Sequence, residues 1–402
     1  MNFKRKVFLI IFLITLFPFK VFAEQEIIPA EVEKKARDEI NRTIKNELTM
    51  LDLRDMENTY QDYSDILNPI VDNKPIKVLI SDLASGKVTL ETENVLEIIL
   101  KLFFDEISKI LPMIVSILVI VALFSILNNL KPGTAETQVA TAAVYVQYIL
   151  VASISTSILI SCFNLGLETI DNLSNFTQSV FPILSVLMVS IGGIVSASLF
   201  SPIVAFLTGF ITLIVKTTFM PMIIILIVFT ILDNISNKIS LNNFSGLIKS
   251  ILKWGVGIIF VVFLGVISIK GLVGSSFDGV SIKATKYTIS KLVPYVGGMV
   301  SDTVDTVAAC SLLLKNAVGI SGLIIMFVII LKPIINIVGC SMLLKLSAAA
   351  LEPISEKRVI TLLDGFSDVL KHLMILIIVV GSMFFITICL LISSSNMNIM
   401  FR

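Results

Sequence analysis

The sequence predicts an all-α, polytopic integral membrane protein with seven or eight transmembrane helices. Hydrophobic residues make up 55% of the chain and charged residues only 15%, against about 45–50% and about 25% in a soluble domain. The mean hydropathy is +0.95. Apolar runs much longer than a core strand requires recur along the chain, which is the pattern of bilayer-spanning helices.

The first 23 residues are predicted to be a secretory signal peptide. Residues 4–6 are basic, residues 7–17 are apolar, and Ala23 fits the position before a cleavage site. The alternative is a first membrane anchor, but the apolar run is shorter than the roughly 20 residues that cross a bilayer. We therefore expect the mature N-terminus to lie outside the cytoplasm.

Residues 24–106 form an acidic segment that is predicted to be helical and extracytoplasmic. Within residues 24–100 there are 17 acidic and 9 basic residues, whereas the remainder of the chain is mildly basic. Ala36, Ile40, Ile44 and Leu48 recur every four residues between charged positions, which indicates an amphipathic helix. So short a segment offers too little apolar surface for a large core of its own, so we expect it to pack on itself, on the membrane or on a partner.

The remaining part, residues 107–402, is predicted to be a multi-span membrane domain. Gly192, Pro202, Lys216 and Pro221 interrupt the third to fifth apolar runs, which form three spans or two spans with one broken helix. The eight runs lie at 108–128, 141–163, 179–198, 201–215, 217–233, 254–274, 318–338 and 373–394.

The distribution of lysine and arginine predicts the sidedness of the loops. The loop that contains Lys131 and the basic loops 234–253 and 339–372 are expected inside. The loop 164–178 has no basic residue and is expected outside. Residues 275–317 are then outside as well, despite four lysines, as a helical element that does not span the bilayer.

The sequence contains no catalytic, cofactor-binding or metal-binding pattern. A P-loop, GxGxxG, HExxH, CxxC and nucleophile elbow are all missing. His372 is the only histidine, and the four cysteines have no close pair spacing. We therefore expect a non-enzymatic protein that needs neither cofactor nor metal and binds no nucleic acid.

Two lysines in the apolar runs are candidates for intramembrane charges. Lys216 lies between the fourth and fifth runs, and Lys332 precedes Pro333 late in the seventh. Burying charge in hydrocarbon is costly and is often functional, whereas the alternative is that both side chains extend to the headgroups. No Asp or Glu lies deep in a clear run, which weakens the case for an ion-coupled transporter.

One segment, "KLVPYVGGMVSDTVDTVAACSLLLKNAVG" at 291–319, is too polar to span a bilayer and too apolar for an ordinary linker. Its proline and paired glycines break the backbone, and its acids fall in the first turn of a following helix. The alternatives are an interfacial helix and a re-entrant or assembly contact. The residues predicted to serve assembly or gating are Pro294, Gly297, Gly298, Asp302, Asp305 and Lys315.

This segment also carries a family resemblance. Residues 277–319, "FDGVSIKATKYTISKLVPYVGGMVSDTVDTVAACSLLLKNAVG", resemble the signature region of the stage III sporulation protein AE family of endospore-forming Firmicutes. Residues 249–274 and 345–355 resemble the family too. The resemblance covers essentially the whole chain, and the long motif is far more specific than a short catalytic pattern.

The resemblance implies a role in spore formation. It implies a large polytopic subunit of the stage III A complex in the mother-cell-derived outer forespore membrane. There the other products of the operon join forespore stage II sporulation protein Q in a transenvelope channel that sustains late forespore gene expression. The subunit would be a pore or export gate in the lipid bilayer. The family offers no catalytic residues to carry over.

Two other functions remain open on the sequence. One is a stand-alone transporter or permease with a binding site near a broken helix at the bilayer midplane. The other is a scaffold that positions further subunits and conducts nothing.

Overall fold

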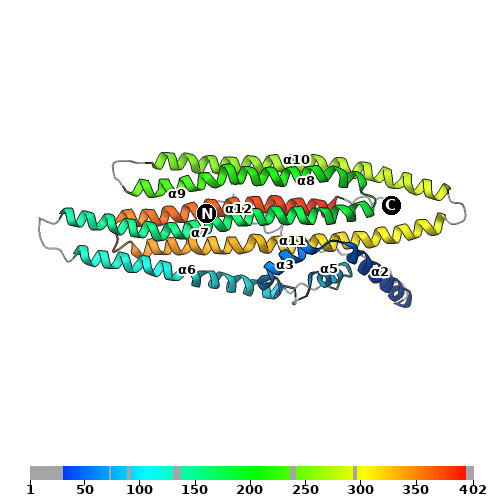
Figure 1. The fold of residues 1–402 in the computed structure, drawn as a ribbon, viewed down its shortest axis with the longest axis horizontal. Coiled ribbons are helices and arrows are strands. Elements are labelled where there is room, and N and C mark those ends of the chain that lie inside the picture. The colour runs from blue at the N-terminus through cyan, green and yellow to red at the C-terminus, as the bar shows by residue number, and fades with distance from the viewer. Residues whose placement is uncertain are drawn as a thin grey trace. The chain divides into compact units, whose positions relative to one another are not determined.

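The computed structural model describes residues 30–71, 74–87, 92–129, 137–235, 241–292 and 297–394. All regular structure in these ranges is helical (Figure 1). Four shorter helices come first: α2 (Ala30–Met50), α3 (Arg54–Asp62), α4 (Ser64–Leu67) and α5 (Ile76–Ala84). The predicted signal peptide lies outside the described residues.

The long helices follow, in antiparallel succession. They are α6 (Thr92–Asn129), α7 (Thr137–Ser190), α8 (Ile194–Ile214), the π turn η2 (Val215–Phe219), α9 (Met220–Ile235), α10 (Asn242–Leu292), α11 (Gly297–Leu351) and α12 (Lys357–Ser393). The chain divides into two compact units, residues 1–42 and 43–402. All features described below belong to the second unit.

The predicted helical class is confirmed, but the count of spans differs from the expectation. Among the described residues, six helical stretches are long and apolar enough to cross a membrane, instead of seven or eight. The second and third apolar runs share α7, because nothing between them breaks a helix. Residues 164–178, which we expected to form an outside loop, are therefore part of that helix.

The fourth and fifth apolar runs also share one continuous helix, α8–η2–α9. The π turn lies directly before Pro221, where a regular turn would bring a carbonyl against the proline ring. Gly192, with φ of 89°, forms the tight turn between α7 and α8, a conformation that favours glycine.

The non-spanning segment 275–317 is divided between two long helices. Its first part ends α10 at Leu292, and its second part begins α11 at Gly297. The helix break expected at Pro294 falls between these ends, although residues 293–296 themselves lie outside the described residues. Residues 336–351 extend the seventh apolar run within α11.

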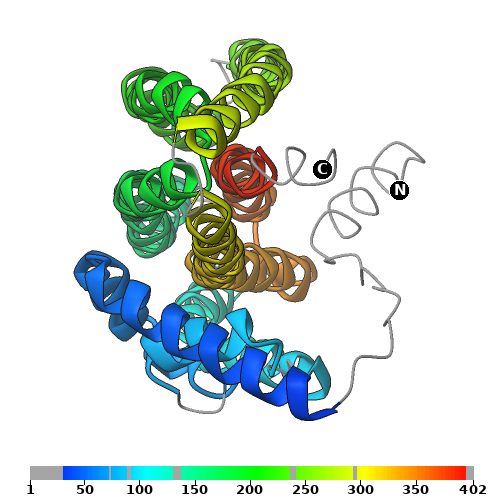
Figure 2. The same cartoon turned by 90° about the vertical axis from the view of Figure 1, so that its right-hand side faces the viewer.

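The core lies where α12 packs between α7 and α11. Figure 2, an end-on view, shows α12 in red beside α7, α10 and α11. A glycine permits the close approach of α12 to α11, because a methyl group at Gly381 would lie 2.7 Å from Ile330 Cδ1. Ile44 and Leu48, near the end of α2, are buried, as their spacing predicts.

Candidate functional site

A polar belt crosses the bundle about halfway along its long helices. Its first member is an ion pair between Lys216 of η2 and Asp171 of α7. The lysine Nζ lies 2.8 and 2.9 Å from the two carboxylate oxygens. Both side chains are partly exposed, so this candidate lysine is paired at the surface instead of being buried alone in hydrocarbon.

The second candidate lysine lies in the same belt. The Nζ of Lys332 in α11 is 5.6 Å from the ring centroid of Tyr63, in position for a cation–π contact. The hydroxyl of Tyr63 also accepts a hydrogen bond of 3.2 Å from Nδ2 of Asn172. Burial raises the pKa of Tyr63, so the ring stays neutral and its face stays available to the lysine.

Helix α6 completes the belt. Nδ2 of Asn336 donates a 2.6 Å hydrogen bond to Glu106, which also pairs with Lys109 at 2.7 Å. We call the residues that these contacts join the polar belt. They are Tyr63, Glu106, Lys109, Asp171, Asn172, Lys216, Lys332 and Asn336.

On one side of the belt the bundle has the properties of a bilayer-embedded slab. Side chains such as Val119, Ile149, Ile225 and Ile251 expose apolar surface on four different helices. Along α11 this slab spans 333–351, which at 1.5 Å per residue is about 28 Å and matches the roughly 30 Å of a hydrocarbon core. The stretches long and apolar enough to cross a membrane are Glu97–Ile126, Ala142–Ser190, Ile194–Asp233, Asn243–Ser268, Val307–Leu351 and Lys357–Ser393, and they continue past the belt. We call their part on this side of the belt the membrane layer.

Aromatic residues mark both edges of the membrane layer, as they do at membrane interfaces. Trp254 is 73% exposed at the belt edge. The residue after it, Gly255, lies against Phe219 at the end of the π turn. At the opposite edge the guanidinium carbon of Arg358 lies 5.3 Å from the ring centroid of Tyr145.

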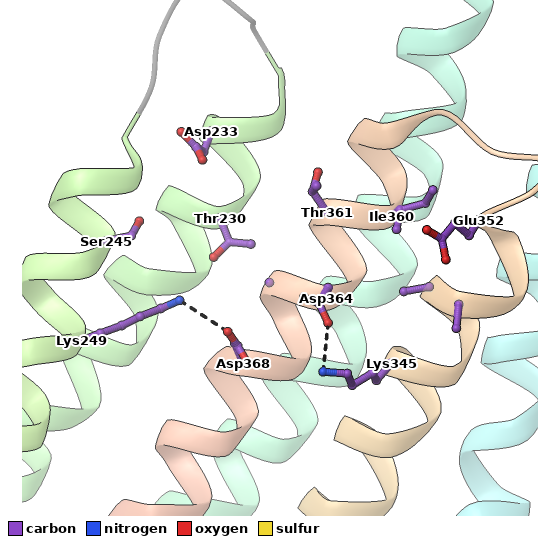
Figure 3. A pocket seen from close by; sticks show the side chains of 13 residues that line it. Thr230, Asp233, Ser245, Lys249, Lys345, Glu352, Ile360, Thr361, Asp364 and Asp368 are labelled. Carbon is purple, nitrogen blue, oxygen red and sulfur yellow. Dashed lines mark ion pairs between the residues drawn. The ribbon is translucent and has the colours of Figure 1, made fainter. Parts of the chain in front are cut away.

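A charged cavity of about 500 Å³ opens within the membrane layer, between α9, α10, α11 and α12 (Figure 3). Two ion pairs cross it. Lys249 of α10 lies 3.9 Å from Asp368 of α12, and Lys345 of α11 lies 3.5 Å from Asp364 of α12. Lys371 reinforces the first pair with a 2.8 Å contact to Asp368.

The cavity carries an excess of negative charge. Its two lysines face four carboxylates, which belong to Asp233, Glu352, Asp364 and Asp368. Hydroxyl groups of Thr230, Ser245 and Thr361 add neutral donors and acceptors. Ionisable residues at membrane depth usually face a bundle interior or a water-filled cavity and mark a pathway or a site, and a negative excess favours cations or basic segments.

Helix α12 positions two of these carboxylates, because it is amphipathic over its first four turns. Asp364 and Asp368 are separated by four residues and share one face. Leu363, Phe366 and Leu370 are buried on the other face. Gly365 lets α9 come close, since a methyl group there would lie 2.6 Å from Thr230 Cγ2.

Sequence reasoning missed this site. We expected residues 339–372 to be a loop, whereas α11 continues to Leu351 and α12 begins at Lys357, so Asp364 and Asp368 lie on a helix and pair with lysines of two other helices. The available signal was the four-residue spacing of the acids among buried apolar positions. The high local charge of the segment indicated a loop instead.

Of the candidates for assembly or gating, the structure describes the side chain of Lys315, which does not line the cavity. Lys315 is fully buried in α11, one turn after Ser311. The hydroxyl of Ser311 lies 3.0 and 3.1 Å from the carboxylate oxygens of Glu47, which attaches the end of α2 to α11. Pro294 lies outside the described residues, as do the side chains of Gly297, Gly298, Asp302 and Asp305 in the first turns of α11.

The wide spacing of the cysteines in the sequence also gave no indication that two of them are in contact. Cys162 of α7 and Cys340 of α11 lie with their sulfur atoms 3.2 Å apart, and both are free thiols in the core. No group of three potential metal ligands occurs among the described side chains. His372 does not line the cavity, and its Nδ1 lies 2.8 Å from the backbone oxygen of Asp368.

Comparison with known proteins places the chain in a family. Residues 75–395, which include the cavity and nearly all of the polar belt, match the family model described as "Stage III sporulation protein AE". The chain belongs to the stage III sporulation protein AE family. The match confirms the resemblance found in the sequence, and with it a role in sporulation.

A curated relative supports the same assignment. The stage III sporulation protein AE of Bacillus subtilis (strain 168) is 28% identical to this chain over 321 residues. The alignment covers 79% of this chain and 80% of that protein. No solved structure matches the chain.

Proposed function

We propose that this family member is a non-enzymatic membrane subunit of the stage III A complex, the sporulation-specific transenvelope channel between mother cell and forespore. It acts as a pore or export-gate component in the mother-cell-derived outer forespore membrane, and late forespore gene expression depends on it. Its partners are the other products of the stage III A operon and stage II sporulation protein Q of the forespore.

Membership of the sporulation family carries this proposal. The charged cavity gives it physical support, because a pore or gate needs polar groups at membrane depth and the cavity supplies six ionisable side chains there. The cavity lies beside the ends of α9 and α11, so it has a short route to one membrane face.

The distribution of basic residues gives the proposed orientation. In the sequence Lys131 lies between α6 and α7, Lys238 lies between α9 and α10, and α12 begins with Lys357 and Arg358, which favours the cytoplasmic side for these positions. Six crossings are an even number, as eight would be. The N-terminus and C-terminus therefore remain outside, and the cavity faces the cytoplasm of the mother cell.

Deletion of the gene tests the proposal. We expect sporulation to stop after engulfment while vegetative growth continues unchanged, measured by microscopy, forespore reporter activity and the count of heat-resistant spores. Normal numbers of heat-resistant spores from the deletion strain would contradict the proposed role.

The cavity itself favours a second candidate, a stand-alone transporter. Two carboxylates, Asp364 and Asp368, line it and pair with lysines of two other helices. Saturable substrate flux in liposomes that contain this protein alone would support that function. Conductance measured with and without the other operon products separates a pore from a purely structural scaffold.

A further inference from the structure

Two free cysteines meet in the core of the long helices, although 178 positions separate them in the sequence. Sγ of Cys162 in α7 lies 3.2 Å from Sγ of Cys340 in α11. The two residues are 1% and 2% exposed. A disulfide bond is about 2.05 Å long, so the sulfur atoms need to approach each other by about 1.2 Å to form one. A small rotation of the two side chains about their Cα–Cβ bonds is enough for that approach.

Four helices surround this pair of thiols. A methyl group at Gly339, the residue before the α11 cysteine, would lie 3.8 Å from Ile107 Cγ1, so α6 packs beside this turn. One turn after the α7 cysteine, a methyl group at Gly166 would lie 3.1 Å from Leu373 Cδ1, so α12 packs there. A thiol oxidised at this place therefore meets the other thiol before it meets any protein in solution.

A row of polar groups leads from the two thiols towards the surface. Oδ1 of Asn336 lies 3.7 Å from both sulfur atoms, where it can accept a hydrogen bond from a thiol. Nδ2 of the same side chain donates the 2.6 Å hydrogen bond to Glu106. That carboxylate pairs with Lys109, whose side chain is 66% exposed. A cysteine that only fills space among apolar side chains needs no such neighbours.

We propose that Cys162 and Cys340 form a site of reversible oxidation, at which hydrogen peroxide converts the two thiols into an intramolecular disulfide. One thiol sulfur attacks a peroxide oxygen and the O–O bond breaks, which gives a sulfenic acid and one water molecule. The second thiol sulfur attacks the sulfenic sulfur, the S–S bond forms, and a second water molecule leaves. In total, two thiols lose two electrons and two protons, and one peroxide is reduced to two water molecules.

The burial of the pair explains the choice of oxidant. Hydrogen peroxide is small and uncharged, so it enters a helix bundle in lipid more easily than an oxidising enzyme or a bulky disulfide does. Reduction reverses the reaction when a dithiol of similarly small size attacks the S–S bond and is itself oxidised to a disulfide.

The disulfide would join two of the helices that form the core. Helix α12 packs between α7 and α11, so a covalent bond between these two helices fixes the width of the space that α12 occupies. A cross-link over so long a loop also restricts the unfolded chain strongly. The inference goes beyond the proposed function, because the disulfide forms or fails to form whether or not the complex conducts.

Peptide mapping of oxidised membranes tests the site. Membranes that contain the whole chain are treated with hydrogen peroxide, the remaining thiols are blocked with N-ethylmaleimide, and the protein is digested for mass spectrometry. We expect a pair of peptides joined through positions 162 and 340, which dithiothreitol separates. Blocked thiols at both positions, or cysteines oxidised singly to sulfinic or sulfonic acid, would show that the two thiols do not form a redox pair.

The other two cysteines provide a matched control, because the packing of α11 on α12 holds them apart. Gly319 of α11 lies opposite Ile392 of α12, and the two helices run antiparallel. Cys389, three residues before that isoleucine, therefore lies opposite a position about 12 residues from Cys310. At 1.5 Å per residue this separates the two thiols by about 18 Å along the bundle.

Two double variants complete the test. The variant Cys310→Ala/Cys389→Ala retains the proposed pair, and we expect it to form the disulfide in the same yield as the wild type. The variant Cys162→Ala/Cys340→Ala retains the distant pair, and we expect it to form no intramolecular disulfide. Equal yields from both variants would overturn the proposal. If a variant fails to fold, the peptide map of the wild type decides.

Discussion

The Nζ atom of Lys216 and the carboxylate of Asp171 lie 2.8 Å apart, although 45 residues separate them in the chain. The pair joins the π turn to the middle of α7 and marks the edge of the membrane layer. Because both side chains are partly exposed, solvent screens the attraction. The position of η2 along α7 therefore depends more on the packing of the two helices than on this ion pair.

The first prediction concerns the energy of this pair. We expect Lys216→Ala to lower the free energy of unfolding by less than about 1 kcal/mol, the usual range for a partly exposed pair. The charge-exchanged variant Lys216→Asp/Asp171→Lys should recover most of the loss. The measurement is thermal unfolding in detergent over a double-mutant cycle. A loss several times larger would mean that the pair lies in a much less polar environment than we infer.

The second prediction concerns packing of α12 on α11. A side chain at Gly381 meets Ile330 Cδ1 at 2.7 Å, so we expect Gly381→Leu to destabilise the protein by about 1–3 kcal/mol, as overpacked cores do. The matched control is Gly209→Leu in α8, where a methyl group meets nothing within 4 Å. If both variants unfold at the wild-type temperature, the two helices do not approach as closely as described.

The third prediction concerns pH and Glu47. Burial raises the pKa of this carboxyl above its ordinary value of 4.5, and the hydrogen bond from Ser311 only partly opposes that effect. In the folded state Glu47 therefore keeps its proton to a higher pH than in the unfolded chain. Stability gained from this group is present below the ordinary value and is lost as the pH rises through the raised value.

Comparison of the wild type with Glu47→Gln measures this effect. The glutamine side chain is neutral at every pH, so we expect the advantage of the variant to grow from pH 4 to pH 7 in thermal unfolding. The Asp52→Asn variant is the control, because Asp52 is exposed and Arg54 lowers its pKa to about 2, which leaves its charge constant in the folded state. We expect only a small change for this variant, confined to below about pH 5, where the unfolded chain still takes up a proton. A constant difference between Glu47→Gln and wild type would contradict the raised pKa.

The fourth prediction concerns the segment that carries the family resemblance. Gly297 and Gly298 begin α11 after the break that follows Leu292. We expect bulky residues at both positions to disrupt assembly and lower the count of heat-resistant spores. The control is Gly257→Leu in α10, where a methyl group has open space around it. If the double variant sporulates like wild type, the segment is only a connector.

The sequence was sufficient for the helical membrane class and the family, because long apolar runs and a long specific motif are local signals. It was insufficient for the number of helices. Lys216 and Pro221 indicated breaks, yet the chain accommodates both with a π turn and continues as a helix. A local pattern also cannot show that residues 164–178 pack against other helices and stay helical for that reason.

The functional contacts were beyond sequence reasoning because they join distant residues. Cys162 and Cys340 are 178 positions apart, and nothing in their spacing indicates the 3.2 Å approach of their sulfur atoms. Asp364 and Asp368 looked like part of a polar loop. In the structure they pair with Lys249 and Lys345, which come from two other helices.

The central claim is that the charged cavity in the membrane layer serves the sporulation role. Its most direct test is the count of heat-resistant spores from a strain whose only copy carries Asp364→Asn and Asp368→Asn, with the protein level in the membrane measured in parallel. The same strain with Asp65→Asn, a position in α4 far from the cavity in sequence, serves as the control. We expect a severe loss of spores at a normal protein level, whereas a wild-type spore count would contradict a role of the cavity in sporulation.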